Sequence, residues 1–208
     1  MNKYGYSKEE IRLFKKLNSP QKIQGYLNSL PFNFREDGVF VSPRMVMKNK
    51  TSDCLEGALF AASVLEFHGE KPLILDLRSA KKPFDYDHII AVFKKFNCFG
   101  AISKTNHAVL RYREPVYKTI RELVMSYFHE YFLNNGTKTL REYSLPYDLN
   151  KLNHLSWRTT DSNLWEIHEV LDEIKHYPVL SKEQIKNLRK ADKIEIESGK
   201  LIDYKKVS

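Results

Sequence analysis

The fold is decided by residues 51–67, whose sequence is TSDCLEGALFAASVLEF. Its first three residues are all of types that cap the N-terminus of a helix. The residues after them are rich in alanine, leucine and glutamate, which favour helix, and Gly69 is a natural C-terminal cap. The pattern therefore predicts a helix from Cys54 to Phe67, with Cys54 in its first turn.

Three short apolar runs follow this helix. They are PLILDL at 72–77, HIIAVF at 88–93 and FGAIS at 99–103, and only a brief turn separates the last two. Dense apolar runs of this length are typical of buried strands. We therefore expect an α+β fold in which the helix that carries Cys54 packs on a small antiparallel sheet.

Cys54 and His88 are the residue types that a thiol site needs. A thiol attacks as the thiolate, and the free amides and partial positive charge at a helix N-terminus lower its pKa. The same amides can face a developing oxyanion. His88 is the candidate base because its strand is expected beside the helix. The alternative is that Cys54 is a small buried residue on an alanine-rich helix, as most free cysteines are.

These segments resemble the core of the transglutaminase-like superfamily, which has a papain-like fold. The resemblance implies a nucleophile at Cys54, a base at His88 and a third residue at or near Ser103, where the family carries an acid. Residues 106–143 are similar to a bacterial group of transglutaminase-like proteins, which implies no particular substrate. The matching core residues are DCLEGALFAA at 53–62, PLILDL at 72–77, DHIIAVF at 87–93 and FGAIS at 99–103.

Several residues are candidates for holding the imidazole of His88 in the tautomer that a base needs. Ser103 takes the third position by the resemblance. Asn106 can substitute if the chain bends back, because an amide performs this task in papain-like enzymes. Asp85 and Asp76 are further candidates through loop geometry.

The rest of the chain is expected to complete a single domain of 208 residues, with its core at about residues 35–110. Capping and periodicity predict two N-terminal helices within 7–30 and a C-terminal helical extension over 115–191. The segment 35–50 has the composition of a loop with at most a brief strand or turn. Residues 193–204 alternate apolar and polar side chains, which predicts a terminal hairpin.

Charge and composition argue against several classes of function. The formal net charge is +8, but basic and acidic residues alternate along the chain and no nucleic-acid-binding motif occurs, so we do not expect a nucleic-acid partner. The two cysteines, Cys54 and Cys98, lack disulfide or zinc spacing and are expected to be reduced. Neither a leader-like start nor an apolar run of roughly 18 residues is seen, which predicts a soluble cytoplasmic protein without a membrane partner.

No cofactor motif occurs in the sequence, and only one histidine pattern suggests a metal. His168, Asp172 and His176 share one face of an expected helix, and all three are possible zinc ligands. Successive steps of four residues spread the outer two over two turns, so a polar solvent face is the better interpretation. We therefore expect neither a metal nor a cofactor.

Two hypotheses of function follow. In the first, the protein is a cysteine-dependent hydrolase or acyltransferase that acts on an amide or acyl bond of a peptide or protein. Cys54 attacks the carbonyl, His88 relays the proton and an acyl-enzyme forms. In the second, the protein is a catalytically inactive transglutaminase-like fold that binds a peptide or protein, which the serine at Ser103 favours. The reactivity of Cys54 discriminates between them.

Overall fold

The computed structural model of the chain describes residues 4–205. It is an α+β fold with eight α-helices, one 3-10 helix and seven strands in this part of the chain. The helices are α1 (Lys8–Lys16), α2 (Pro20–Asn28), α3 (Pro43–Asn49), α4 (Cys54–Phe67), α5 (Ile120–Phe128), η1 (Leu149–Leu155), α6 (Trp165–Glu173), α7 (Lys182–Lys186) and α8 (Lys193–Gly199). The strands are β1 (Leu73–Ser79), β2 (His88–Lys95), β3 (Cys98–Ser103), β4 (Arg113–Tyr117), β5 (Leu140–Ser144), β6 (Tyr147–Asp148) and β7 (His176–Pro178).

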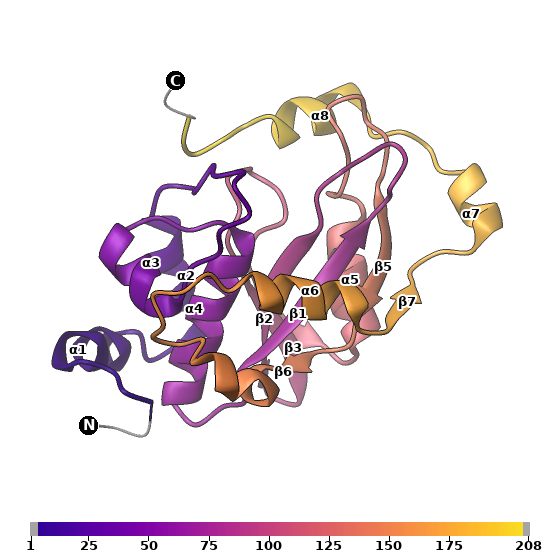
Figure 1. Cartoon of the computed structure of the whole chain (residues 1–208). Helices are drawn as coiled ribbons and strands as arrows, with labels where there is room; N and C mark the ends of the chain where they lie inside the picture. Colours follow the sequence, from indigo (N-terminus) through magenta and orange to yellow (C-terminus); the bar gives the residue numbers. More distant parts are fainter. Residues whose placement is uncertain (1–3, 206–208) are drawn as a thin grey trace.

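The strands form one seven-stranded antiparallel sheet. Its order is β4-β3-β2-β1-β5-β7, and β6 pairs with the N-terminal end of β1 (Figure 1). The register places Leu77 of β1 opposite His88 of β2, and Ile90 of β2 opposite Ser103 of β3. The first residue of β2 and the last residue of β3 therefore lie at the same end of the sheet.

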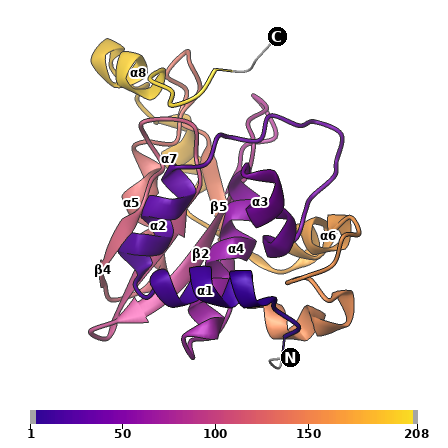
Figure 2. The same ribbon diagram turned by 90° about the vertical axis from the view of Figure 1, so that its left-hand side faces the viewer.

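Helix α4 is the central element of one face of the sheet. The Asp53 side chain accepts from the Glu56 amide and the Glu56 carboxylate accepts from the Asp53 amide, so a capping box begins the helix at Cys54. Every residue of 55–66 is buried, so this stretch has no polar face towards solvent and is mostly apolar. Figure 2 shows α2 and α3 flanking α4 on this face.

Alternation along the strands divides the core into two clusters. Ile89 and Ala91 of β2 pack with α4, whereas Ile90 and Val92 pack with α5 on the opposite face. Successive side chains of a strand point to opposite faces of the sheet, so this division is expected for a strand covered on both sides. The expected packing of the Cys54 helix on an antiparallel sheet is confirmed.

The predictions for two segments were wrong. Residues 35–50 are not all loop, because Ser42 caps and Pro43 begins the short helix α3. The extension 115–191 is not purely helical either. It provides β5, β6, β7 and most of β4, because short runs such as 140–144 gain their strand hydrogen bonds from partners distant in sequence.

The terminal hairpin predicted at 193–204 was also wrong, since residues 193–199 form α8. A capping box between Asp192 and Glu195 begins this helix. The apolar and polar alternation suggested a strand, but Ile194 is 80% exposed and so does not mark a buried face. None of the helices within residues 4–205 is long and apolar enough to cross a membrane.

Candidate functional site

Cys54 is the first residue of α4, and the start of β2 lies beside it. The backbone of Ile89 interacts with the thiol, as does the backbone of Leu55 in the next position of the helix. His88 immediately precedes Ile89, so one peptide unit separates the strand position that contacts Cys54 from the candidate base. Cys54 as a residue is half-buried.

The expectation of a low pKa for Cys54 was wrong, although the amide at the helix N-terminus acts in the expected direction. Burial and the neighbouring carboxyl of Asp53 raise the pKa of the thiol to about 12, although the amides of Ile89 and Leu55 act in the opposite direction. Asp76 on β1 raises it further. The thiol is therefore protonated at neutral pH.

His88 and Ser103 are hydrogen-bonded to each other. The Nε2 atom of His88 lies 2.7 Å from Ser103 Oγ, and Ser103 Oγ lies 2.5 Å from the Leu110 carbonyl oxygen. A carbonyl only accepts and a serine hydroxyl has one proton, so Ser103 donates to Leu110 and accepts from His88 Nε2–H. The neutral imidazole then carries its lone pair on Nδ1.

The end of β3 that carries Ser103 is held in place by α2. The Gln24 side chain accepts from the Ser103 amide at 2.9 Å and donates to the Ser103 carbonyl at 2.8 Å. A double hydrogen bond of this kind restricts the backbone on both sides of the serine hydroxyl. The Ser103 hydroxyl therefore bonds His88 from a backbone position that Gln24 holds in place.

The imidazole of His88 is buried and starts from the face of β2 opposite to α4. Burial lowers the pKa of His88 to about 4, so the ring is neutral at pH 7. Strand alternation puts His88 on the side of Ile90, towards α5, whereas Cys54 contacts β2 at Ile89. No hydrogen bond joins Cys54 to His88 in the described part of the chain.

The other candidates for a third residue form hydrogen bonds with groups other than His88. Asn106 exchanges two hydrogen bonds of 2.9 Å with the backbone of Tyr204 and so ties down the C-terminal segment. The carboxylate of Asp85 accepts a hydrogen bond from Thr139. Of the residues considered from the sequence, the structure thus brings Ser103 to His88, while Cys98 lies at the opposite end of β2 and β3.

One buried pair near Cys54 was missed. Asp76 is 1% exposed, and its Oδ2 lies 2.9 Å from Nε2 of His176 on β7. The other ring nitrogen of His176, Nδ1, lies 2.7 Å from the Ile174 carbonyl oxygen. Both nitrogens are therefore engaged, and His176 has no free lone pair for Cys54. A lone aspartate inside the apolar run 72–77 was the sequence signal for this pair.

Asp76 also belongs to a cluster of three carboxylates, and an arginine lies beside two of them. Oxygen atoms of Asp76, Asp87 and Asp172 lie within 4.8 Å of one another. The Arg78 guanidinium approaches Asp76 at 4.0 Å and Asp172 at 3.8 Å. The metal pattern weighed from the sequence is divided, because His176 lies on β7 and bonds Asp76, away from His168 on α6.

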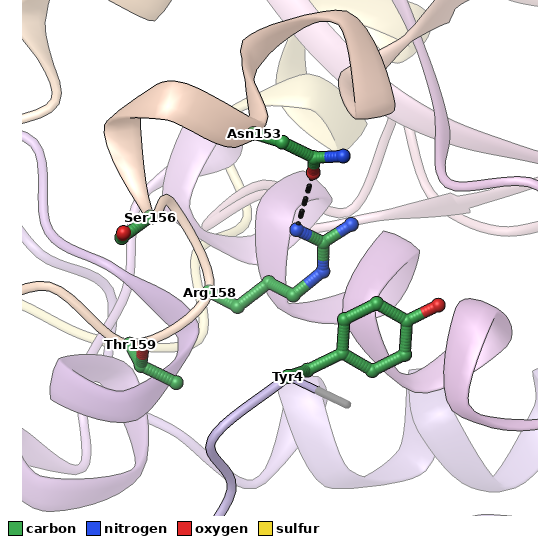
Figure 3. A pocket seen from close by; sticks show the side chains of 5 residues that line it. All are labelled: Tyr4, Asn153, Ser156, Arg158 and Thr159. Carbon is green, nitrogen blue, oxygen red and sulfur yellow. Dashed lines mark hydrogen bonds between the residues drawn. The ribbon is translucent and has the colours of Figure 1, made fainter. Parts of the chain in front are cut away.

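A separate cavity of about 290 Å³ lies beside η1, far along the chain from Cys54 (Figure 3). Its Arg158 guanidinium donates to the Asn153 side chain at 2.7 Å. The same guanidinium is paired with the buried carboxylate of Glu66, at 2.5 and 2.7 Å. Because Glu66 neutralises this charge, the arginine serves the packing of η1 on α4.

Comparisons with known proteins do not place the chain in a family. A scan against protein-family models gave no match, and a search of curated proteins gave none either. The groups that stay candidates for the expected chemistry are the thiol of Cys54 and the imidazole of His88, with its lone pair on Nδ1.

Proposed function

We propose that the protein is a cysteine-dependent hydrolase or acyltransferase of the transglutaminase-like type, acting on an amide or acyl bond. Cys54 is the nucleophile, His88 is the base and Ser103 is the positioning residue that holds the imidazole. The observation that carries this proposal is the hydrogen-bond chain from His88 Nε2 through Ser103 Oγ to the Leu110 carbonyl. This chain leaves Nδ1 as the nitrogen that can take a proton.

The reaction starts from a neutral pair in this proposal. With the pKa of Cys54 raised to about 12 and that of His88 lowered to about 4, neither group is charged at pH 7. As the sulfur attacks the carbonyl carbon, Nδ1 of His88 takes the thiol proton, so charge develops only during the step. The amides of Cys54 and Leu55, which precede the Glu56 amide bonded to Asp53, can stabilise the resulting oxyanion.

The remaining steps return each group to its starting state. The imidazolium gives its proton to the leaving amine as the carbon–nitrogen bond breaks, which leaves a thioester on Cys54. Water or a second amine then attacks the thioester, His88 accepts its proton, and the sulfur leaves as thiolate and is reprotonated. Water as acceptor makes the protein a hydrolase, and an amine makes it a transferase.

Acyl-enzyme formation tests the proposal directly. An activated acyl donor such as p-nitrophenyl acetate should give a burst of p-nitrophenol and an acetyl adduct on Cys54, detected by intact mass and peptide mapping. Cys54→Ala should abolish both signals, and Cys98→Ala is the matched control because Cys98 lies at the opposite end of β2 and β3. A burst that survives in Cys54→Ala would exclude Cys54 as the nucleophile.

Two observations favour a second function. Because the pKa of Cys54 is raised to about 12 and His88 starts from the opposite face of β2, the same fold suits a non-catalytic module that binds a peptide or protein. In that case Cys54→Ala leaves partner binding unchanged and no acyl adduct forms on the wild-type chain. The burst experiment therefore separates the two functions.

A further inference from the structure

Three aspartates from separate segments of the chain converge at one place. Asp76 lies on β1, Asp87 immediately precedes β2, and Asp172 lies in the last turn of α6, which passes over β1 (Figure 1). One carboxylate oxygen of each aspartate lies within 4.8 Å of the other two. Oxygen ligands on opposite sides of a magnesium or calcium ion are about 4–5 Å apart, so the three oxygens can share one such ion.

The buried member of this cluster has an oxygen atom without a partner. Asp76 is 1% exposed, and its Oδ2 lies 2.9 Å from Nε2 of His176. Its Oδ1 is also buried, but it accepts no hydrogen bond from any residue within 4–205. A buried carboxylate oxygen is costly unless a donor or an ion satisfies it. Carboxylates that bind metal ions are commonly oriented by a hydrogen bond from an outer residue, which is the part His176 has here.

The arginine beside the cluster does not satisfy these carboxylates by hydrogen bonds. The Arg78 guanidinium lies 4.0 Å from Asp76 Oδ2 and 3.8 Å from Asp172 Oδ1, and both distances are too long for a hydrogen bond. It donates instead to the backbone carbonyl of Asp172 at 2.7 Å. The carboxylate oxygens therefore stay available to another ligand.

The carboxylates around the cluster outnumber the cations in ion pairs with them within residues 4–205. Arg78 is one such cation, and it also lies 3.7 Å from Glu142. The rings of His168 and His176, which form ion pairs here, add at most two positive charges. Negative charge therefore remains even with both rings protonated, and a divalent cation would neutralise it. The carboxylates are Asp76, Asp87, Asp172 and Glu142.

We infer that Asp76, Asp87 and Asp172 form a binding site for a hard divalent cation such as Mg²⁺, Mn²⁺ or Ca²⁺. Carboxylate oxygens are the ligands that these ions prefer, whereas thiolates and imidazoles suit zinc. The ion joins β1, the start of β2 and the end of α6, and water completes its coordination. The site does not depend on the proposed function of Cys54.

A titration with Mn²⁺ tests the site, because the electron paramagnetic resonance signal of the free ion falls when the ion binds. The full chain is first dialysed against EDTA and then into buffer of low ionic strength. One Mn²⁺ should bind per chain with a dissociation constant below about 1 mM, the weak end of the range for protein sites of this kind. Mg²⁺ or Ca²⁺ should displace it, and Na⁺ at the same ionic strength should not.

Three variants make the result specific. Asp172→Asn changes an exposed residue, so the fold should survive, and it should weaken Mn²⁺ binding by about tenfold or more because a charged ligand is lost. Glu173→Gln is the matched control, since it removes the same charge from the next position of α6, outside the cluster, and should bind Mn²⁺ like wild type. Arg78→Gln should tighten binding severalfold, because it removes a positive charge beside two of the ligands.

The outcomes decide whether the ion is coordinated. Weaker binding in Asp172→Asn alone, with thermal unfolding of the metal-free variant like that of wild type, would support the site. Absence of Mn²⁺ binding to the wild-type chain up to about 1 mM would overturn it. Binding that Asp172→Asn leaves unchanged would place the ion elsewhere, and equal weakening in Asp172→Asn and Glu173→Gln would show diffuse attraction to an acidic surface. Either of these two results would also overturn the inference.

Discussion

The imidazole of His88 and the hydroxyl of Ser103 face each other across β2 and β3, with Nε2 and Oγ 2.7 Å apart. The two residues come from opposite ends of their strands, and the antiparallel register brings them together. Because the Ser103 hydroxyl donates a hydrogen bond to the Leu110 carbonyl and accepts one from His88 Nε2–H, the Nδ1 atom of the imidazole keeps its lone pair. In the proposed mechanism, the Ser103 hydroxyl has the positioning role that a carboxylate or an amide has in papain-like enzymes.

Replacing Ser103 by alanine tests the role of this hydrogen bond. Ser103→Ala should lower acyl-adduct formation on Cys54 by tenfold or more, since a base in the wrong tautomer forfeits part of the ~10²–10⁴-fold that general-base catalysis provides. Ser103→Thr keeps the hydroxyl and is the matched control. A burst of equal size in the alanine variant would show that Ser103 does not position His88.

The low pKa of His88 predicts a loss of stability in acid. Burial lowers this pKa to about 4 in the folded chain, against about 6.5 in the unfolded one. The unfolded state therefore takes up a proton first, and stability falls as the pH drops from about 6.5 towards 4. The full difference is worth about 3 kcal/mol. Urea unfolding at pH 7 and pH 4 measures it.

The control for this acid effect is His88→Gln, which keeps a side-chain N–H for Ser103 and does not titrate. Other groups change protonation over the same pH range in both proteins. The difference between wild type and His88→Gln therefore isolates the histidine. Equal losses of unfolding free energy in the two proteins between pH 7 and pH 4 would contradict the assignment.

Removing Arg158 alone should lower the unfolding free energy more than removing Arg158 and Glu66 together, because the two buried charges neutralise each other. Their side chains are 5% and 7% exposed, and the guanidinium binds the carboxylate through two nitrogens. Arg158→Met should lower the unfolding free energy by about 3–5 kcal/mol, because it leaves a buried carboxylate without a counter-ion. The double variant Glu66→Met/Arg158→Met should be less destabilised than Arg158→Met alone in urea unfolding. A double variant as unstable as the sum of the single ones would count against this explanation.

A close approach on α4 leaves no room for a side chain at Gly57. A Cβ atom there would lie 2.4 Å from the Cβ of Lys104, a buried residue that follows Ser103. Gly57→Ala should therefore destabilise the protein by about 1–3 kcal/mol. Gly25→Ala, on a helix where nothing lies within 4 Å, should instead stabilise it by about 0.5–1 kcal/mol. Thermal melts of the two variants should shift in opposite directions.

Local signals in the sequence predicted the parts of the fold that local interactions determine. Capping residues located the start of α4 at Cys54, and apolar runs located β1, β2 and β3. The strand β7 and the helix α8 were missed. Three residues of β7 gain their hydrogen bonds from β5, more than thirty residues away, and alternating residues on a short exposed helix resemble a strand.

The candidate site, too, could be predicted from the sequence only in part. Residue types and order pointed to Cys54 and His88, and the family resemblance pointed to Ser103. The direction in which the pKa of Cys54 is shifted depends instead on the burial of the thiol and on Asp53 and Asp76. A helix N-terminus was expected to lower this pKa, and burial outweighs it. The partner of Asp76, His176, lies 100 residues away, so only the fold reveals the pair.

The measurement that tests the account most directly is the pH dependence of Cys54 alkylation by iodoacetamide in wild type, His88→Ala and Cys98→Ser. If His88 acts as the base, the rate for Cys54 should rise with an apparent pKa near 4, level off through neutral pH and fall about 10²-fold in His88→Ala. Cys98→Ser should leave this profile unchanged. A rate that is the same in wild type and His88→Ala, and that climbs steadily towards pH 12, would show a thiol that ionises alone and would contradict the proposed function.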